Sequence, residues 1–187
     1  MAAPANNPTP PAHLWAPWRM EYIETLSGPK EECFLCRALR ETERDRENLL
    51  LKRGRRTLAV LNRFPYTGGH CLVAPRDHVA ALSDLDSETL TEIMETLRDL
   101  TEALTEALRP NGFNVGFNLG RCAGAGLPGH LHAHIVPRWE GDTNFMPVLG
   151  NVRVIPEFLD QTREKILQAA AKLNLPGLAR PAKGDGP

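Results

Sequence analysis

HLHAHIV, residues 130–136, carries three of the six histidines of this chain at alternate positions. In an extended strand, alternate side chains share one face and lie about 6.6 Å apart. The pattern therefore predicts a strand with three imidazoles on one side and the residues Leu131, Ala133 and Ile135 in the core on the other. Such a strand would present chemically active groups on a rigid support.

Two simpler interpretations of the histidines stay open at this point. They could be ordinary polar residues of a half-exposed strand, or they could chelate zinc and leave a fourth position for water. The preceding loop GRCAGAGLPG, residues 120–129, weighs against a site that holds only a metal. Its glycines, which include Gly124 and Gly126, let backbone N–H groups approach a phosphate closely.

The composition limits the classes of partner. The 187 residues are 42% hydrophobic and carry 22 Lys+Arg against 23 Asp+Glu, so no general positive field attracts nucleic acid or membranes. The sequence has neither a secretory signal nor an apolar run of about 20 residues. We expect a cytoplasmic protein with one domain, residues 13–176, and disordered tails at residues 1–12 and 177–187. The basic cluster KRGRR, residues 52–56, is interpreted as a solvated turn, with contact to a polyphosphate tail as the alternative.

Glycine and proline separate four runs of β type, residues 57–62, 70–74, 113–119 and 130–136. A helix with a cap near residues 83–87 is predicted to bury one face, which consists of Leu90, Ile93, Met94, Leu97, Leu100, Leu104 and Leu108. A second helix is predicted to begin at Pro156 and to bury Phe158, Leu159, Ile166, Leu167 and Ala170. The order predicts an α+β fold with helices packed on a mostly antiparallel sheet.

HLHAHIV with the following Pro137 and Arg138 resembles the His-φ-His-φ-His-φ-φ signature of the histidine triad (HIT) superfamily of nucleotide hydrolases and transferases. LNRFPYTGGHCLVAPRDHV, NGFNVGFNLG and HLHAHIVPRWEGDTNF follow in the order of that family, and LWAPWRMEYI near the start and PRWEGDTNF after the triad resemble its bacterial diadenosine tetraphosphate phosphorylase and hydrolase branch. The resemblance covers about residues 14–175. It implies the HIT-like fold and a homodimer.

The same resemblance implies an enzyme that transfers or hydrolyses a nucleotidyl group of dinucleoside polyphosphates such as diadenosine tetraphosphate, with inorganic phosphate or water as acceptor. His132 would be the nucleophile, because a neutral imidazole held in one tautomer by a backbone carbonyl can form a nucleotidyl-imidazole intermediate. His134 would contact the phosphate and the leaving oxygen. The alternatives are a regulatory nucleotide-binding protein with slow or no turnover, a hydrolase of nucleoside phosphoramidates, and metal-dependent hydrolysis on the three histidines.

Nucleotide contacts of the family fall on four further positions. The resemblance implies that Asn62 binds the ribose hydroxyls, that His70 lies near the sugar, that Asn118 contacts phosphate and that Trp139 lies beside the phosphate exit. Asn62 could also be a turn residue, and His70 and Trp139 could be core residues. Gly126 departs from the family, which has Gln or Ser there, so that only a backbone N–H is left to contact a phosphate.

Cys33 and Cys36 stand in the C-x-x-C spacing, which supplies two soft ligands, whereas tetrahedral zinc requires four. Zinc-containing members of the superfamily complete such a motif with the histidine that ends the PRDH segment and with the first triad histidine, here His78 and His130. The resemblance thus implies one closed, structural Cys₂His₂ zinc site per chain, whose ligands would also accept iron. A pair of buried thiols or a redox pair is the alternative.

Overall fold

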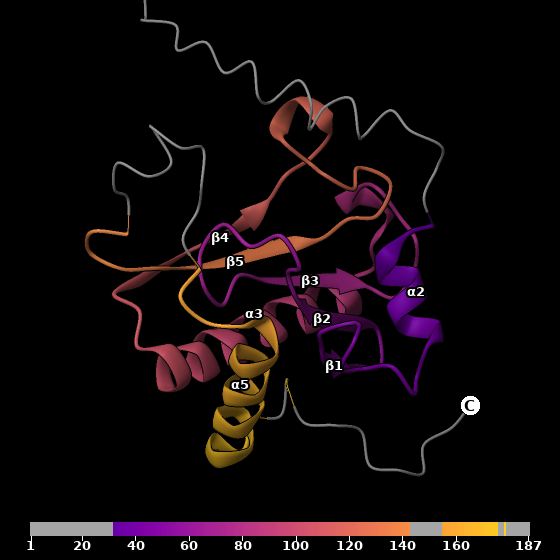
Figure 1. Ribbon diagram of the computed structural model, residues 1–187. Coiled ribbons are helices and arrows are strands. Elements are labelled where there is room, and N and C mark those ends of the chain that lie inside the picture. Colours follow the sequence, from indigo (N-terminus) through magenta and orange to yellow (C-terminus); the bar gives the residue numbers. More distant parts are fainter. Residues whose placement is uncertain (1–31, 143–154, 176–177, 179–187) are drawn as a thin grey trace, which may run out of the picture. The chain divides into compact units, whose positions relative to one another are not determined.

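The computed structural model describes residues 32–142, 155–175 and 178. Its elements, drawn in Figure 1, are α2 (Phe34–Arg40), β1 (Leu50–Arg53), β2 (Thr57–Leu61), β3 (Cys71–Pro75), η1 (Leu82–Asp84), α3 (Ser87–Leu108), β4 (Gly112–Phe117), η2 (Arg121–Ala123), β5 (Ala133–Arg138) and α5 (Leu159–Leu173). The predicted order of strands, helix, strands and helix is present, and α2 and β1 are additional. The predicted tails, apart from Leu178, and the segment LWAPWRMEYI lie outside the described residues.

The five strands form one antiparallel sheet in the order β1-β2-β3-β5-β4. Leu61 of β2 pairs with Cys71 of β3, which in turn pairs with Ile135 of β5, and Val115 of β4 also pairs with Ile135. The short connection between β2 and β3 leaves no room for a crossover, so these neighbours run in opposite directions. The predicted α+β class with a mostly antiparallel sheet is confirmed.

The sheet separates two apolar clusters. Ala133 and Ile135 of β5 are fully buried in the cluster that α3 and α5 cover, as the alternation of the triad segment predicts. Leu72 of β3 belongs to the other cluster, which includes Leu35 of α2. Because His134 pairs directly with Leu72, it shares this second face of the sheet. The sheet therefore directs His134 away from α3 and α5.

Helix α3 begins after Asp86, whose carboxylate accepts a hydrogen bond of 2.7 Å from the Thr89 N–H. The prediction that Leu90 and Met94 lie on its buried face is wrong, since they are 37% and 62% exposed. The buried face includes Thr89 and Thr96 instead, and Thr96 Oγ1 accepts a hydrogen bond from Lys52 of β1. Ile93, Leu97, Leu100 and Leu104 are buried as predicted. No described helix is long and apolar enough to cross a membrane.

The predicted ends of two elements are wrong. Strand β5 begins at Ala133 and not at His130, because the preceding backbone bonds elsewhere: the Leu131 N–H donates to the Val79 carbonyl at 2.7 Å. Helix α5 begins at Leu159 and not at Pro156, and Phe158 before it is 79% exposed instead of buried. Two histidines of the triad thus precede the regular strand.

The interpretation of KRGRR as a solvated turn is wrong for its first two residues, which belong to β1. Lys52 is buried, donates to Thr96 Oγ1 at 2.7 Å and lies 3.5 Å from Glu92. Arg53 donates to backbone carbonyls at the end of α2 and to Asp45. These cations satisfy buried acceptors and a helix C-terminus, which the local sequence pattern does not reveal.

Candidate active site and metal cluster

His132 is buried immediately before β5, and its Nδ1 lies 2.8 Å from the backbone oxygen of His130. A carbonyl oxygen can only accept a hydrogen bond, so Nδ1 carries the hydrogen and Nε2 keeps its lone pair. Burial lowers the pKa of His132 more than the bond to the carbonyl raises it. His132 is therefore a neutral imidazole near pH 7 with a fixed tautomer and a basic Nε2.

His134 receives the opposite tautomer through a chain of hydrogen bonds. The backbone N–H of Tyr66 donates to His70 Nδ1 at 3.1 Å, so a neutral His70 carries its hydrogen on Nε2. That Nε2 lies 3.0 Å from His134 Nδ1 and donates to it. Burial and then the neighbouring His132 lower the pKa of His134 to about 4, so this ring is also neutral and holds its hydrogen on Nε2.

The two rings together form an acceptor next to a donor. Their centroids are 4.9 Å apart, with an angle of 60° between the planes. His132 offers the lone pair of a nucleophile, and His134 offers an N–H that can stabilise negative charge on a nearby oxygen. The arrangement suits a displacement in which an anionic oxygen leaves.

Both predicted asparagines contact this histidine network. Asn118 Nδ2 lies 3.3 Å from His134 Nε2, and since both nitrogens carry hydrogen in this tautomer, the contact does not engage the Nε2–H. Asn62 Nδ2 donates to His70 Nδ1 at 3.1 Å, while its oxygen accepts the Phe64 N–H at 3.0 Å. Asn62 is thus a turn residue that also touches the site, and His70 is fully buried.

The glycine-rich loop folds beside Asn118. Gly120 and Gly124 have φ values of +85° and +90°, which side chains rarely adopt, and a Cβ at position 124 would lie 3.9 Å from Asn118 Nδ2. Gly126 is exposed in the same loop. Trp139 is half-buried after β5, and its backbone N–H donates to Asp142. Among the described residues it makes no hydrogen bond or ring contact with a histidine.

Tyr66 is the site residue that the sequence analysis missed. Its ring centroid lies 4.6 Å from that of His70 and 6.0 Å from that of His134, nearly parallel to the latter, and the residue is 43% exposed. Its aromatic face therefore covers the pair of histidines whose hydrogen bond sets the tautomer. Its position in the β2–β3 connection did not distinguish it from Phe64, which is more exposed.

A second group of side chains forms a candidate metal cluster. The donor atoms of Cys33, Cys36, His78 and His130 all lie within 4.8 Å of one another. His130 Nδ1 is 3.2 Å from Cys33 Sγ and 3.5 Å from Cys36 Sγ, and His78 Nδ1 is 3.3 Å from Cys36 Sγ. In a tetrahedral zinc site sulfur and nitrogen ligands lie about 3.6 Å apart. The donors present therefore fit a cation of that size and geometry.

The fold positions these four donors from three segments. Cys33 caps α2 and Cys36 lies three residues on, so both thiols face the same side of the helix start. The hydrogen bond from Leu131 to Val79 joins the segments of His130 and His78. His130 Nε2 bonds to the Pro75 carbonyl at 2.9 Å, which leaves Nδ1 free for a cation.

Residues 43–141, slightly more than half of the chain, match the HIT domain family. The chain belongs to the HIT family. Over 155 residues it is 39% identical to an AP-4-A phosphorylase of Mycobacterium tuberculosis, and the match covers 80% of each protein.

The HIT fold is also seen in two similar structures. A Zn-bound histidine triad family protein from Mycobacterium smegmatis is 28% identical with a TM-score of 0.57, covering 67% of this chain and 86% of that one. A hypothetical histidine triad nucleotide-binding protein from Sulfolobus tokodaii is 26% identical with a TM-score of 0.61, covering 76% and 94%.

Proposed function

We propose that this HIT protein transfers or hydrolyses a nucleotidyl group of dinucleoside polyphosphates, such as diadenosine tetraphosphate, through a covalent intermediate on His132. The observation that carries the proposal is the hydrogen bond from His132 Nδ1 to the His130 carbonyl, which leaves a basic Nε2 on a buried, neutral ring. The similarity to the mycobacterial AP-4-A phosphorylase supports this substrate class.

In the first step the Nε2 lone pair of His132 attacks the α-phosphorus. The N–P bond forms as the bond from phosphorus to the bridging oxygen breaks, and ATP leaves with those electrons. The hydrogen on Nδ1 remains with the now cationic ring and keeps its bond to the His130 carbonyl. The Nε2–H of His134 donates to the oxygen on which negative charge develops.

In the second step an acceptor attacks the adenylyl-histidine and His132 leaves as a neutral ring. Phosphate as acceptor gives ADP, and water gives AMP. Asn118 and the backbone N–H groups around Gly124 and Gly126 are proposed to hold the phosphates, with Trp139 at the phosphate exit. Asn62 is proposed to bind the ribose. A homodimer and a cytoplasmic location belong to the same proposal.

Product analysis by anion-exchange chromatography tests the reaction. Diadenosine tetraphosphate is mixed with the protein in the presence and absence of inorganic phosphate, next to the His132→Asn variant. ADP plus ATP formed only with phosphate identifies a phosphorylase, and AMP plus ATP formed without phosphate identifies a hydrolase. Absence of turnover in both mixtures overturns the substrate assignment.

Intact-mass analysis of rapidly quenched samples tests the covalent step separately. The wild-type protein should gain the mass of one adenylyl group and His132→Asn should not. Both proteins should give the same circular dichroism spectrum, which shows that the variant is folded. If His132→Asn turns over normally, another group is the nucleophile. If neither protein turns over but both bind adenine nucleotides equally, the chain is a nucleotide-binding regulatory protein.

We further propose that Cys33, Cys36, His78 and His130 hold one structural zinc ion. Four protein ligands fill a tetrahedral shell and leave no position for a catalytic water, so the ion would support the fold. Metal analysis by plasma mass spectrometry should give one zinc per chain in the wild type and none in Cys33→Ser. Cys122→Ser, whose thiol is exposed outside the cluster, is the matched control. Iron in place of zinc would correct the metal, and full zinc in Cys33→Ser would overturn the ligand set.

A further inference from the structure

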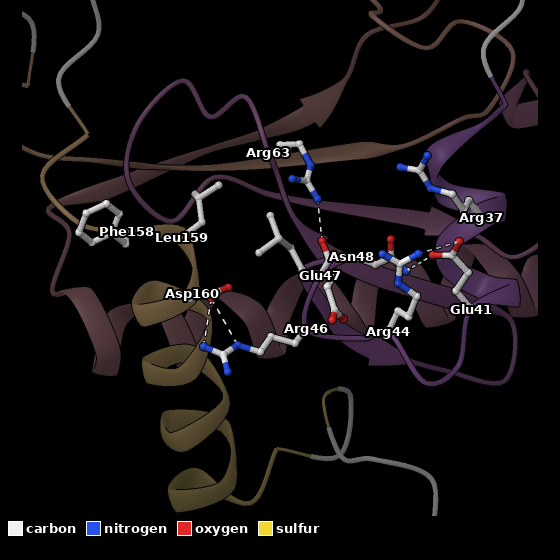
Figure 2. A pocket seen from close by; sticks show the side chains of 11 residues that line it. Arg37, Glu41, Arg44, Arg46, Glu47, Asn48, Arg63, Phe158, Leu159 and Asp160 are labelled. Atoms are coloured by element: carbon white, nitrogen blue, oxygen red, sulfur yellow. Dashed lines mark hydrogen bonds and ion pairs between the residues drawn. The ribbon is translucent and has the colours of Figure 1, made fainter.

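A pocket of about 830 Å³ is lined by residues of α2, of the loop that follows it, of the β2–β3 connection and of the start of α5. Figure 2 shows its side chains. Four arginines line it, namely Arg37, Arg44, Arg46 and Arg63, together with the aromatic ring of Phe158. None of the histidines, cysteines or loop glycines described above is among its lining residues. Its volume is within the range of small-molecule sites, about 300–1,000 Å³.

Two of the arginines are balanced by carboxylates in the pocket wall. Arg46 donates through Nε and Nη2 to Asp160 Oδ2 at 3.3 and 3.2 Å. Arg44 lies 3.7 Å from Glu41, which also accepts a bond of 2.9 Å from the Asn48 amide. These contacts are drawn as dashed lines in Figure 2. The negative charges of Asp160 and Glu41 are therefore already paired with Arg46 and Arg44.

The other two arginines form no ion pair with a carboxylate of the described residues. Arg63 Nη2 donates to the backbone oxygen of Glu47 at 2.6 Å, which is a neutral acceptor. Arg37 forms no ion pair with any residue in the described part of the chain. The carboxylate of Glu47 is the one remaining acidic group of the lining, so the pocket has an excess of positive charge although the whole chain has a net charge of -1.

The chemistry of these groups indicates the ligand. A guanidinium has five N–H donors in a planar fork that fits phosphate oxygens two at a time. Phe158 is 79% exposed at the same pocket and offers a flat face on which a base can stack. We propose that this arginine pocket binds an oligophosphate chain, either free or as part of a nucleotide, through Arg37 and Arg63. The site uses none of the reacting histidines and so is additional to the proposed function.

Titration with sodium tripolyphosphate, followed by the Nε–H signals of the arginines in NMR spectra, tests the site. The signals of Arg37 and Arg63 should shift, and Arg37→Ala and Arg63→Ala should each weaken binding about tenfold through loss of charge-assisted hydrogen bonds. Glu47→Gln should strengthen binding, because it removes the opposing charge, and loss of folding cannot cause a gain. Arg55→Ala is the matched control, since its side chain is 80% exposed and lies outside the pocket.

The source of the phosphate chain is distinguished with ATP in place of tripolyphosphate, on a His132→Asn background that prevents turnover. If ATP binds more tightly and Phe158→Ala reduces its affinity to that of tripolyphosphate, the ligand is a nucleotide. If Phe158→Ala changes neither affinity, the ligand is a free phosphate chain.

Two outcomes overturn the site. In the first, only backbone signals of residues 120–124 shift while the arginine signals stay in place. In the second, Arg55→Ala weakens binding as much as Arg37→Ala does. A failure of dinucleotide turnover affects neither arm, so this proposal and the proposed function can fail independently.

Discussion

His132 and His134 are chemically identical residues two positions apart that acquire different hydrogen positions from their neighbours. The His130 carbonyl fixes the hydrogen of His132 on Nδ1, whereas His70 donates to Nδ1 of His134 and leaves its hydrogen on Nε2. Nε2 thereby becomes an acceptor in His132 and a donor in His134. Reactivity here depends on hydrogen-bond partners at least as much as on the histidines themselves.

His134 makes stability depend on pH. Burial, followed by the neighbouring His132, lowers its pKa from 6.5 to about 4, so between these values the unfolded chain binds more protons than the folded one. The free energy of unfolding should therefore decrease as the pH falls below about 6.5, by on the order of 1–2 kcal/mol from this residue at about pH 5. The free energy of unfolding, measured by urea denaturation at pH 7 and at pH 5, should differ less between the two pH values in His134→Gln than in the wild type. An equal difference in both proteins would contradict the lowered pKa of His134.

His70 acts through His134 and is a positioning residue. His70→Phe removes the donor to His134 Nδ1 and releases its tautomer, so we expect kcat to fall about 10–100-fold with little change in KM. His70→Gln keeps an N–H in the same region and should restore part of the rate. Nitrogen-15 NMR of the imidazoles should show mixed tautomers for His134 in His70→Phe. A rise in KM with kcat unchanged would instead assign His70 to substrate binding.

At the scale of elements, the connection between β2 and β3 depends on one glycine. Gly69 has φ +76°, and a Cβ there would lie 2.5 Å from Leu108 Cδ1 of α3. Gly69→Ala should destabilise the protein by about 2–4 kcal/mol, through backbone strain and overpacking. Gly68→Ala is the control, because a Cβ at position 68 meets nothing within 4 Å. Thermal unfolding should give a lower melting temperature for Gly69→Ala than for Gly68→Ala. Equal melting temperatures would refute the steric argument.

The helices and strands that the sequence predicts are those with a recognisable local pattern of apolar residues. Strands β2 and β3 are short apolar runs between turns, and the leucines of α3 repeat at helical spacing. Helix α2 was missed because it has seven residues and no side-chain cap, and β1 because its last two residues are charged. Both depend on tertiary contacts such as Arg53 with the end of α2, which the local pattern does not contain.

The same distinction applies to the candidate site. Spacing pointed to the three histidines of the triad. The resemblance assigned His132 and His134 to the reaction and supplied the partners of Cys33 and Cys36, which the structure brings together. Tyr66 was not found, because its position over His70 and His134 arises from the turn between two strands. Predicted roles toward a substrate stay predictions for every residue of the site.

At the scale of the whole molecule, the cluster of cysteines and histidines joins three parts of the chain. α2 is too short to be stable as an isolated helix, and apart from Leu35 and Ala38 it has few buried residues. The cluster ties it to the segment after β3 and to the segment before β5. His130 belongs to the cluster while its carbonyl holds His132, so the proposed metal site and the orientation of the proposed nucleophile meet in one residue.

Removal of the proposed zinc ion should therefore lower stability and activity together. With a chelator, the melting temperature should fall and hydrogen exchange should increase first in α2, while α3 stays protected, because α3 lies on the other face of the sheet. The rate should fall as the His130 carbonyl loses its fixed position. Equimolar zinc should restore both quantities in parallel. Loss of activity with an unchanged melting temperature would instead mean that the metal takes part in the reaction, since a catalytic ion can leave without loosening α2, whereas a structural ion cannot.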